Sequence, residues 1–241
     1  MSNYAVHTEK LGKRFGKFDA VKNLDLAVQQ GEIFGFLGAN GAGKTTAIRM
    51  LCGLLLPSSG AGRVAGFDIY KENEKIKQRI GYMSQKFSLY DDLTPAENIE
   101  FYGGVYGLQR QALLKKRAAL LNELGLVEQA DTPTRALPLG FKQRLALSCA
   151  LLHDPSIIFL DEPTGGVDPE ARRNFWDLIY QMARQGKTIF VTTHYMDEAE
   201  YCNRVSIMYQ GEIIALDSPQ ALKQQYGKAS MQEVFIHLVD R

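Results

Sequence analysis

Residues 38–46 combine glycines, a lysine and two threonines at a spacing that suits phosphate binding. They read Gly38, Ala39, Asn40, Gly41, Ala42, Gly43, Lys44, Thr45 and Thr46, and the first eight match the pattern G-x-x-x-x-G-K-[ST]. Glycines let successive backbone N–H groups turn toward phosphate oxygens, and a helix that begins here adds positive potential. We expect Lys44 to contact the β- and γ-phosphates of a nucleotide, Thr45 to bind Mg²⁺ and Thr46 to contact the α-phosphate. A glycine-rich turn that binds nothing is the plainer alternative.

Two adjacent carboxylates, Asp161 and Glu162, form the second half of the predicted nucleotide site. They follow an apolar run over residues 157–160, which is typical of a buried strand. Ionised side chains at a buried strand end need partners, so packing alone is a poor reason for them. We expect Asp161 to reach the Mg²⁺ shell through water and Glu162 to activate the attacking water as a general base. An exposed acidic strand end is the alternative here.

The elements that position these residues alternate between strand and helix toward both ends of the chain. Apolar runs and turn residues predict strands over 4–9, 24–28, 33–37, 62–69, 157–160, 187–192, 205–209 and 212–216. Helices are predicted over 44–55, from Asp168 to Gly186, and in a final segment from Ser218 to near Gly227. The segment between them, over 94–153, reads as helical throughout.

Two apolar stripes organise this helical segment. The first stripe joins Leu114, Ala118 and Leu121 beside Leu113, Leu120 and Leu124, with Lys115, Lys116 and Arg117 expected on the opposite side. The second stripe joins Phe141, Leu145, Cys149 and Leu152. The predicted fold class is α/β: a P-loop NTPase core with an N-terminal antiparallel β region and an inserted all-helical subdomain. We expect one domain over 1–241, with an ATP-binding core over 1–85 and 154–241 and the helical subdomain over 86–153.

Composition excludes some classes of function but does not identify one. The chain has 241 residues, of which 45% are hydrophobic and 23% charged, and its net charge is +1. This balance gives no reason to expect electrostatic capture of nucleic acid or anionic lipid. Cys52, Cys149 and Cys202 are scattered, so we expect small buried hydrophobes in a reducing compartment. Residues 1–10 lack a signal peptide and no apolar run reaches about 18–20 residues, so we expect a cytosolic protein whose membrane pore is made elsewhere.

The segment over 161–169 resembles the Walker B motif and D-loop of ATP-binding-cassette (ABC) ATPases, and Asp168 falls in the D-loop part. The resemblance extends along the chain in the expected order. Phe15 fills the position of the A-loop aromatic, which implies stacking on adenine. Gln85 matches the Q-loop glutamine, which implies contact with Mg²⁺ and water, and His194 matches the switch histidine that contacts the γ-phosphate. ATP and Mg²⁺ are the implied cofactors, and Lys44, Gln85, Glu162 and His194 the implied catalytic residues.

The family's signature, Leu-Ser-Gly-Gly-Gln, is altered here to Leu137, Pro138, Leu139, Gly140 and Phe141. In the family two cassettes pair head to tail, and each signature covers the ATP held by the opposite phosphate loop. Pro138 offers neither hydroxyl nor N–H, and Leu139 adds bulk where close backbone approach is needed. Each lost donor to a charged phosphate costs about 1.5–3 kcal/mol. Either the chain pairs with a non-identical or fused second cassette, or the family tolerates the change and homodimers work.

The resemblance also implies a class of transporter. Residues 87–98 and 231–238 resemble exporter-type cassettes that serve ABC-2 permeases. The implied function is an ATP-hydrolysing subunit, peripheral on the cytoplasmic face of the membrane, that powers export through a separate integral membrane permease. Two alternatives stay open: a non-transport cassette, such as a ribosome-associated factor, and a regulatory module that binds ATP with little hydrolysis. No nucleic-acid partner is expected.

Overall fold

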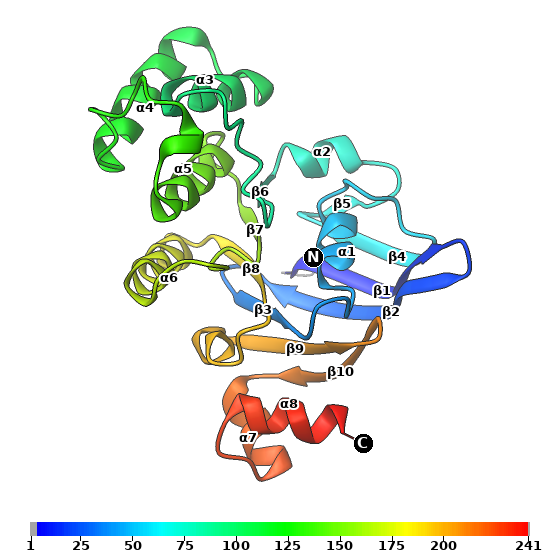
Figure 1. Ribbon diagram of the computed structural model, residues 1–241. Coiled ribbons are helices and arrows are strands. Elements are labelled where there is room, and N and C mark those ends of the chain that lie inside the picture. The colour runs from blue at the N-terminus through cyan, green and yellow to red at the C-terminus, as the bar shows by residue number, and fades with distance from the viewer. Residues whose placement is uncertain (1–3, 241) are drawn as a thin grey trace.

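Two β-sheets carry the fold in the computed structural model, which describes residues 4–240 (Figure 1). The four-stranded sheet has the order β2-β1-β4-β5 and is antiparallel; its strands are β1 (Tyr4–Phe15), β2 (Phe18–Gln29), β4 (Ser59–Val64) and β5 (Phe67–Asp68). The six-stranded sheet has the order β10-β9-β3-β8-β7-β6. Its strands are β3 (Ile33–Leu37), β6 (Ile80–Met83), β7 (Ile157–Asp161), β8 (Thr188–Thr193), β9 (Arg204–Tyr209) and β10 (Glu212–Asp217).

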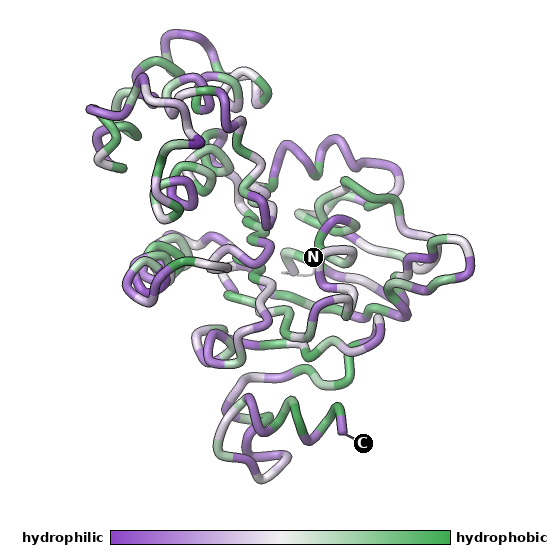
Figure 2. The backbone as a smooth tube through the Cα atoms, viewed as in Figure 1, coloured by the Kyte–Doolittle hydropathy of each residue, from purple (hydrophilic) through white to green (hydrophobic). Residues whose placement is uncertain are grey.

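The centre of the larger sheet is parallel and covered on both faces. β3 pairs with β8 and β9, β8 with β7, and β7 with β6, all in parallel; only β10 runs antiparallel, to β9. All residues of β3, β7 and β8 are buried, which explains their nearly continuous apolar runs. Alternation along the strands sends Phe34, Phe36 and Phe159 toward α1 (Lys44–Leu51), and Leu37 and Leu160 toward α6 (Pro169–Arg184). In Figure 2 the hydrophobic stretches follow these strands.

The antiparallel strands are longer than the sequence predicts. β1 continues to Phe15 rather than ending at residue 9, because the register shifts between Thr8 and Leu11 and resumes beyond. Lys10 takes a left-handed φ of 49° at this irregularity, which breaks the alternation that marks a strand. The strand predicted over 62–69 is in fact β4 and β5, separated by a turn at Ala65 and Gly66, both with positive φ.

The middle of the chain folds into a group of helices, the last of which packs Ala146 and Leu147 against the larger sheet (Figure 1). They are α3 (Pro95–Val105), α4 (Arg110–Glu123), the short η1 (Thr134–Ala136) and α5 (Leu139–Leu151), while α2 (Asn73–Lys77) precedes β6. The second predicted stripe is confirmed, since Leu145, Cys149 and Leu152 are buried with Phe141 packed beside them. Within residues 4–240, no helix has both the length and the apolar character required to span a membrane.

The predicted face of α4 is partly wrong. Leu113, Leu121 and Leu124 are buried, but Leu114 is 39% exposed and Ala118 is exposed. Two of the three cations expected on the opposite side contact other elements: Arg117 pairs with Glu100 of α3, and the Lys116 ammonium donates to the Leu152 carbonyl over 2.7 Å. Lys115 is exposed, as predicted. Two neighbouring stripes on this helix are both leucine-rich, so contact with α3 and α5 decides which one is buried, and the sequence of α4 alone does not.

Two helix ends also differ from the predictions. α1 stops at Leu51 rather than residue 55, because Gly53 adopts φ +68° and the N–H groups of Gly53 and Leu54 donate to the carbonyls of Met50 and Arg49. This is the hydrogen-bond pattern of a Schellman cap. The helix predicted as the last, α7 (Pro219–Tyr226), is followed by α8 (Met231–Val239). The Ser230 hydroxyl caps α8 by accepting the Glu233 N–H.

Three predictions about local structure are confirmed. Asp168 is the N-cap of α6, with Pro169 in its first turn and Gly186 just beyond its end at φ +83°. β9 and β10 form the expected hairpin around Gln210 and Gly211. Cys52, Cys149 and Cys202 are free and buried, and burial raises the pKa of each thiol, that of Cys149 to about 12.

A histidine joins the helical region to the sheet. His153 follows α5, its ring stacks on Tyr106 with centroids 3.8 Å apart, and its Nε2 donates to the Ile80 carbonyl of β6 over 2.9 Å. Its Nδ1 is buried without a hydrogen-bond partner. Burial lowers the pKa of His153, against the opposing effect of the Ile80 hydrogen bond, and protonation would leave a charged N–H without an acceptor.

We therefore expect the stabilising contribution of His153 to depend on pH. Because its folded pKa lies below the ordinary 6.5, the unfolded chain binds the proton more readily. The contribution is fully present above pH 6.5 and is lost as pH falls through the folded pKa. Urea unfolding of the protein and of His153→Gln, at pH values from 7.5 to 5, should show a difference in unfolding free energy that shrinks toward low pH. A constant difference would contradict this account.

Candidate active site

The phosphate loop connects β3 to α1 at the carboxyl edge of the parallel sheet. Its fold depends on glycine at two positions of close approach. Gly43 has φ +104°, and a Cβ there would lie 2.6 Å from the Ala20 carbonyl oxygen. A Cβ on Gly38 would lie 2.4 Å from the Met208 carbonyl oxygen. Side chains would therefore push the loop away from β2 and β9, on which its curvature rests.

The Lys44 ammonium is buried, with 4% of the residue exposed. Its Nζ donates to the carbonyls of Gly38 over 2.7 Å and Ala39 over 3.1 Å, and lies 3.5 Å from Glu162 Oε1. Burial lowers the pKa of Lys44, and the neighbouring Glu162 opposes this change. The lysine thus binds the loop and the carboxylate opposite it, both within reach of any phosphate in the loop.

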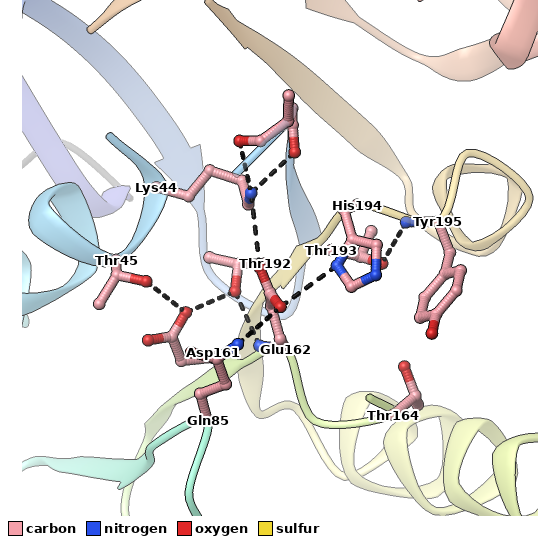
Figure 3. A network of polar contacts seen from close by, with 12 residues as sticks. Lys44, Thr45, Gln85, Asp161, Glu162, Thr164, Thr192, Thr193, His194 and Tyr195 are labelled. Atoms are coloured by element: carbon pink, nitrogen blue, oxygen red, sulfur yellow. Dashed lines mark hydrogen bonds and ion pairs between the residues drawn. The ribbon is translucent and has the colours of Figure 1, made fainter. Parts of the chain in front are cut away.

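Glu162 is the residue on which the site converges. Besides Lys44, the Gln85 amide donates to its Oε2 over 3.0 Å, and His194 Nδ1 donates to the same oxygen over 3.2 Å (Figure 3). Its backbone has a left-handed φ of 47°, and its N–H donates to the Thr192 hydroxyl over 2.8 Å. Such a conformation is costly for a residue with a Cβ and persists where surrounding contacts impose it.

Asp161 is held by two hydroxyls on the same oxygen. Its Oδ1 accepts from Thr45 over 3.1 Å and from Thr192 over 2.7 Å (Figure 3). Burial raises the pKa of Asp161, and the two hydroxyl hydrogen bonds act against it. A hydroxyl and a carboxylate oxygen side by side are hard oxygen ligands of the kind that Mg²⁺ takes together with phosphate and water. Among residues 4–240 there is no group of three or more His, Cys, Asp or Glu side chains suited to a metal.

A cavity of about 540 Å³ lies over the phosphate loop. Its walls include Asn40, Gly41, Gly43, Lys44, Thr45, Thr46, Gln85 and Glu162 from the site, and Phe15, Phe18 and Ala20 from the first two strands. This size is within the range of small-molecule sites. The structure therefore brings the predicted residues Phe15, Lys44, Gln85 and Glu162 to one cavity, and His194 and Asp161 contact residues of its wall.

Phe18 is a wall residue that the sequence reasoning missed. It pairs with Phe15 across the β1–β2 hairpin, so both rings stand at the same edge. The two residues are 49% and 64% exposed, respectively, which is unusual for phenylalanine. The signal was available in the sequence: two aromatic residues separated by Gly16 and Lys17 fit a two-residue hairpin turn, and Gly16 has φ +58°.

The altered signature lies away from this cavity. Pro138, Gly140 and Phe141 line a separate hollow of about 260 Å³ together with Asp168, between the N-terminal ends of α5 and α6. Pro138 is the N-cap of α5, so Leu139 and Gly140 already belong to its first turn rather than preceding the helix. Asp168 Oδ1 accepts the Ala171 N–H over 2.9 Å, and Leu139 is 41% exposed. Leu137 is buried.

Two further buried polar residues near the site belong to no sequence motif. Gln143 of α5 is buried and donates to the Pro163 carbonyl, just after Glu162, over 2.7 Å. Glu198 is fully buried and accepts from Thr164 and Thr193. The sequence does not indicate these contacts, because Gln143 and Glu198 bind residues of other elements.

Comparison with known proteins gives consistent matches. The family model described as ABC transporter matches residues 21–165. The probable multidrug ABC transporter ATP-binding protein YbhF of Escherichia coli K12 is 48% identical over 97% of this chain, which spans 41% of that protein's length. The linearmycin resistance ATP-binding protein LnrL of Bacillus subtilis is 39% identical over 92% of this chain and 72% of its own. The dimeric post-hydrolysis structure of the ATP-binding cassette MJ0796, with ADP and Pi, has a TM-score of 0.80 at 26% identity, covering 88% of this chain and 98% of that one.

Proposed function

The chain belongs to the ABC transporter family, and we propose that it binds and hydrolyses ATP to power export of a substrate through a separate membrane permease. One observation carries the hydrolytic part: Lys44, Gln85 and His194 all contact the buried Glu162 carboxylate beside the phosphate loop. In this proposal residues 1–241 form one nucleotide-binding domain. Residues 1–85 and 154–241 are its ATP-binding core, and 86–153 its helical subdomain.

The proposed mechanism assigns each contact a task. The backbone N–H groups of 39–43 and the N-terminus of α1 receive the phosphates, and Lys44 moves from the loop carbonyls to the β- and γ-phosphate oxygens. Glu162 accepts the proton of the attacking water, while Gln85 and His194 orient that water and the γ-phosphate. Mg²⁺ bound by Thr45, Asp161 and Gln85 would neutralise charge on the phosphates. Thr46 contacts the α-phosphate.

The base is tested by Glu162→Gln, which keeps the shape of the side chain and one oxygen that can accept from Gln85 and His194, but removes its negative charge and its basicity. We expect ATP turnover to fall by about 100-fold or more, the usual scale for a lost general base, while the Kd for ATP changes little. The variant should also accumulate ATP-bound dimers, measurable by size-exclusion chromatography with light scattering.

A matched control is Glu74→Gln, which changes an exposed glutamate on α2. It should leave turnover, ATP affinity and dimerisation as they are. Full turnover in Glu162→Gln would show that Glu162 is not the general base. Absence of turnover in the parent protein with any partner would instead favour the second function, a regulatory module that binds ATP with little hydrolysis. The convergence of three side chains on Glu162 makes that module the less favoured function.

We further infer that Phe15 and Phe18 together receive the adenine ring. Both rings stand at the open edge of the cavity and face the loop that receives the phosphates. The Lys13 ammonium lies 5.1 Å from the centre of the Phe15 ring and covers a face of it. The exposed Phe18 then offers a second apolar surface for the base.

Phe18→Ala should weaken ATP binding by about fivefold or more, since one base–aromatic stack contributes about 1–3 kcal/mol. Binding of tripolyphosphate, which has no base, should be unchanged, and Phe18→Tyr should restore ATP affinity. Phe101→Ala removes an exposed phenylalanine from α3 and serves as control. Isothermal titration calorimetry with ATP and with tripolyphosphate gives the Kd for the parent protein and the three variants. Equal weakening of both ligands in Phe18→Ala would contradict a contact between Phe18 and adenine.

The altered signature leads us to propose a heterologous or fused second cassette. The first turn of α5 presents the N–H groups of Leu139 and Gly140, but Pro138 has no hydroxyl to offer a phosphate held by a partner. The exposed Leu139 side chain also stands where a partner's loop would approach. Pairing of two cassettes is supported by the dimeric structure of MJ0796, and a fused second cassette by the length of YbhF, of which the chain spans only 41%.

Replacing Pro138 by Ser and Leu139 by Gly should therefore raise ATP turnover of the isolated chain several-fold at concentrations where it dimerises. Two regained donors to a charged phosphate would favour the closed dimer. Turnover is measured against protein concentration, with dimerisation followed by light scattering. An unchanged rate in a demonstrably dimeric sample would show that the signature is not the weak element and that homodimers suffice.

The permease is proposed to be of the ABC-2 type, with the chain on the cytoplasmic face of the membrane. YbhF is a probable multidrug ABC transporter ATP-binding protein and LnrL is a linearmycin resistance ATP-binding protein, which supports export of a small molecule. Residues 87–98 carry exposed Tyr90, which packs edge-on against the exposed Phe101 of α3 with centroids 4.6 Å apart. Purification of the intact complex from membranes, with identification of the partner by mass spectrometry, tests this assignment.

A further inference from the structure

The end of β8 carries two threonines with different tasks. Thr192 and Thr193 are successive residues of a strand, so their side chains point to opposite faces of the sheet. The Thr192 hydroxyl accepts the Glu162 N–H and donates to Asp161. The Thr193 hydroxyl instead donates to Glu198 over 2.6 Å. It also accepts the Tyr195 N–H over 3.0 Å (Figure 3). The strand that leads into His194 is thus fixed on both faces.

Glu198 is a fully buried carboxylate with no place in the proposed chemistry. It begins the short helix η2 (Glu198–Tyr201), and it is 0% exposed. Its Oε1 accepts from the Thr164 hydroxyl over 2.5 Å, and its Oε2 accepts from Thr193. Arg172 of α6 supplies the opposite charge, with its Nε 3.6 Å from Oε1. Burying a carboxylate is costly, and an apolar residue would fill the same volume without that cost.

The two hydroxyls that Glu198 binds belong to the segments that carry the reacting groups. Thr164 lies two residues after Glu162, in the segment over 163–168 that leads to the N-cap of α6. Thr193 immediately precedes His194. One carboxylate therefore ties together the backbone on which the proposed base sits and the backbone on which the histidine sits. Arg172 also lies over the Tyr195 ring at 4.2 Å, which joins α6 to the same junction.

We propose that Glu198 is a positioning residue that holds Glu162 and His194 in mutual register through Thr164 and Thr193. This inference rests on the proposed hydrolysis, because it assigns a task within that reaction. Loss of either hydroxyl leaves the phosphate loop and the cavity intact. It breaks the bridge through Glu198, so that only the direct His194–Glu162 contact and the pairing of β7 with β8 still hold the two residues together. The effect therefore falls on the chemical step rather than on ATP binding.

The test compares Thr164→Val with Thr8→Val in the intact protein together with any membrane subunit that co-purifies. Both variants remove a buried hydroxyl of the same shape; Thr8 lies in the antiparallel sheet, donates to the Leu24 carbonyl and accepts the Leu26 N–H. We expect Thr164→Val to lower kcat about tenfold with the Kd for ATP within twofold of the parent. Thr8→Val should lower the unfolding temperature comparably without changing kcat.

Three further variants make the assignment specific: Thr164→Ser, Thr193→Val and the double variant Thr164→Val/Thr193→Val. Thr164→Ser returns the hydroxyl and should restore kcat. The kcat of the double variant Thr164→Val/Thr193→Val should be about equal to that of the slower of the two single variants, because both hydroxyls act through one carboxylate. Overturning results are a parent-like kcat in Thr164→Val, a loss confined to ATP affinity, or fully multiplicative effects in the double variant.

The parent protein separates this inference from the proposed function. If the parent binds ATP and turns it over while Thr164→Val does so equally fast, the positioning role is wrong and the proposed function stands. If the parent, with its membrane subunit, shows no turnover, the proposed hydrolysis is wrong and the positioning role is lost with it.

Discussion

The structure depends on the placement of negative charge at the carboxyl edge of a buried parallel sheet. Asp161 is 1% exposed and Glu162 is 9% exposed, so each must find hydrogen bonds or cations inside the protein. Lys44 reaches Glu162 from the helix after β3, Gln85 from the segment after β6, and His194 from the end of β8. Three strands of one sheet thus deliver their polar ends to a single carboxylate. The arrangement requires the strand order 3-8-7-6, because only then do these ends lie side by side.

The same constraint explains the backbone around Glu162. A left-handed φ places its side chain toward the phosphate loop rather than along the direction of β7, and its N–H donates to both the hydroxyl and the carbonyl oxygen of Thr192. Asp161, still within the strand, points at Thr45 instead. Two adjacent acids are thereby separated onto different partners, which reduces the repulsion that two ionised neighbours would suffer. The strained backbone conformation of Glu162 is therefore what separates the two carboxylates.

Local sequence was sufficient where each element had its own signal. Five of the six strands of the larger sheet were predicted, and burial on both faces makes β3 and β7 apolar without interruption. The short β6 was not predicted. The phosphate loop and the adjacent acids were evident because their residues are contiguous. Features that depend on contacts between two elements, or on an irregular backbone, could not be predicted from the local sequence. The buried face of α4 depends on α3 and α5, the length of β1 is hidden by the irregularity at Lys10, and Glu198 gains its partners only when β7 and β8 align.

The altered signature bears on how the two halves of a transporter cooperate. Within this chain the residues that contact Glu162 are complete, whereas the first turn of α5 lacks the hydroxyl that a phosphate in the partner would use. Binding and activation of ATP belong to one surface, and closure over the partner's ATP belongs to another. Gln143 joins these surfaces, because it lies on α5 behind Pro138 and donates to the Pro163 carbonyl beside Glu162. A shift of α5 on dimerisation would therefore pull directly on the segment over 163–168. In the proposed mechanism, a partner that moved the signature surface would therefore also change the geometry around Glu162.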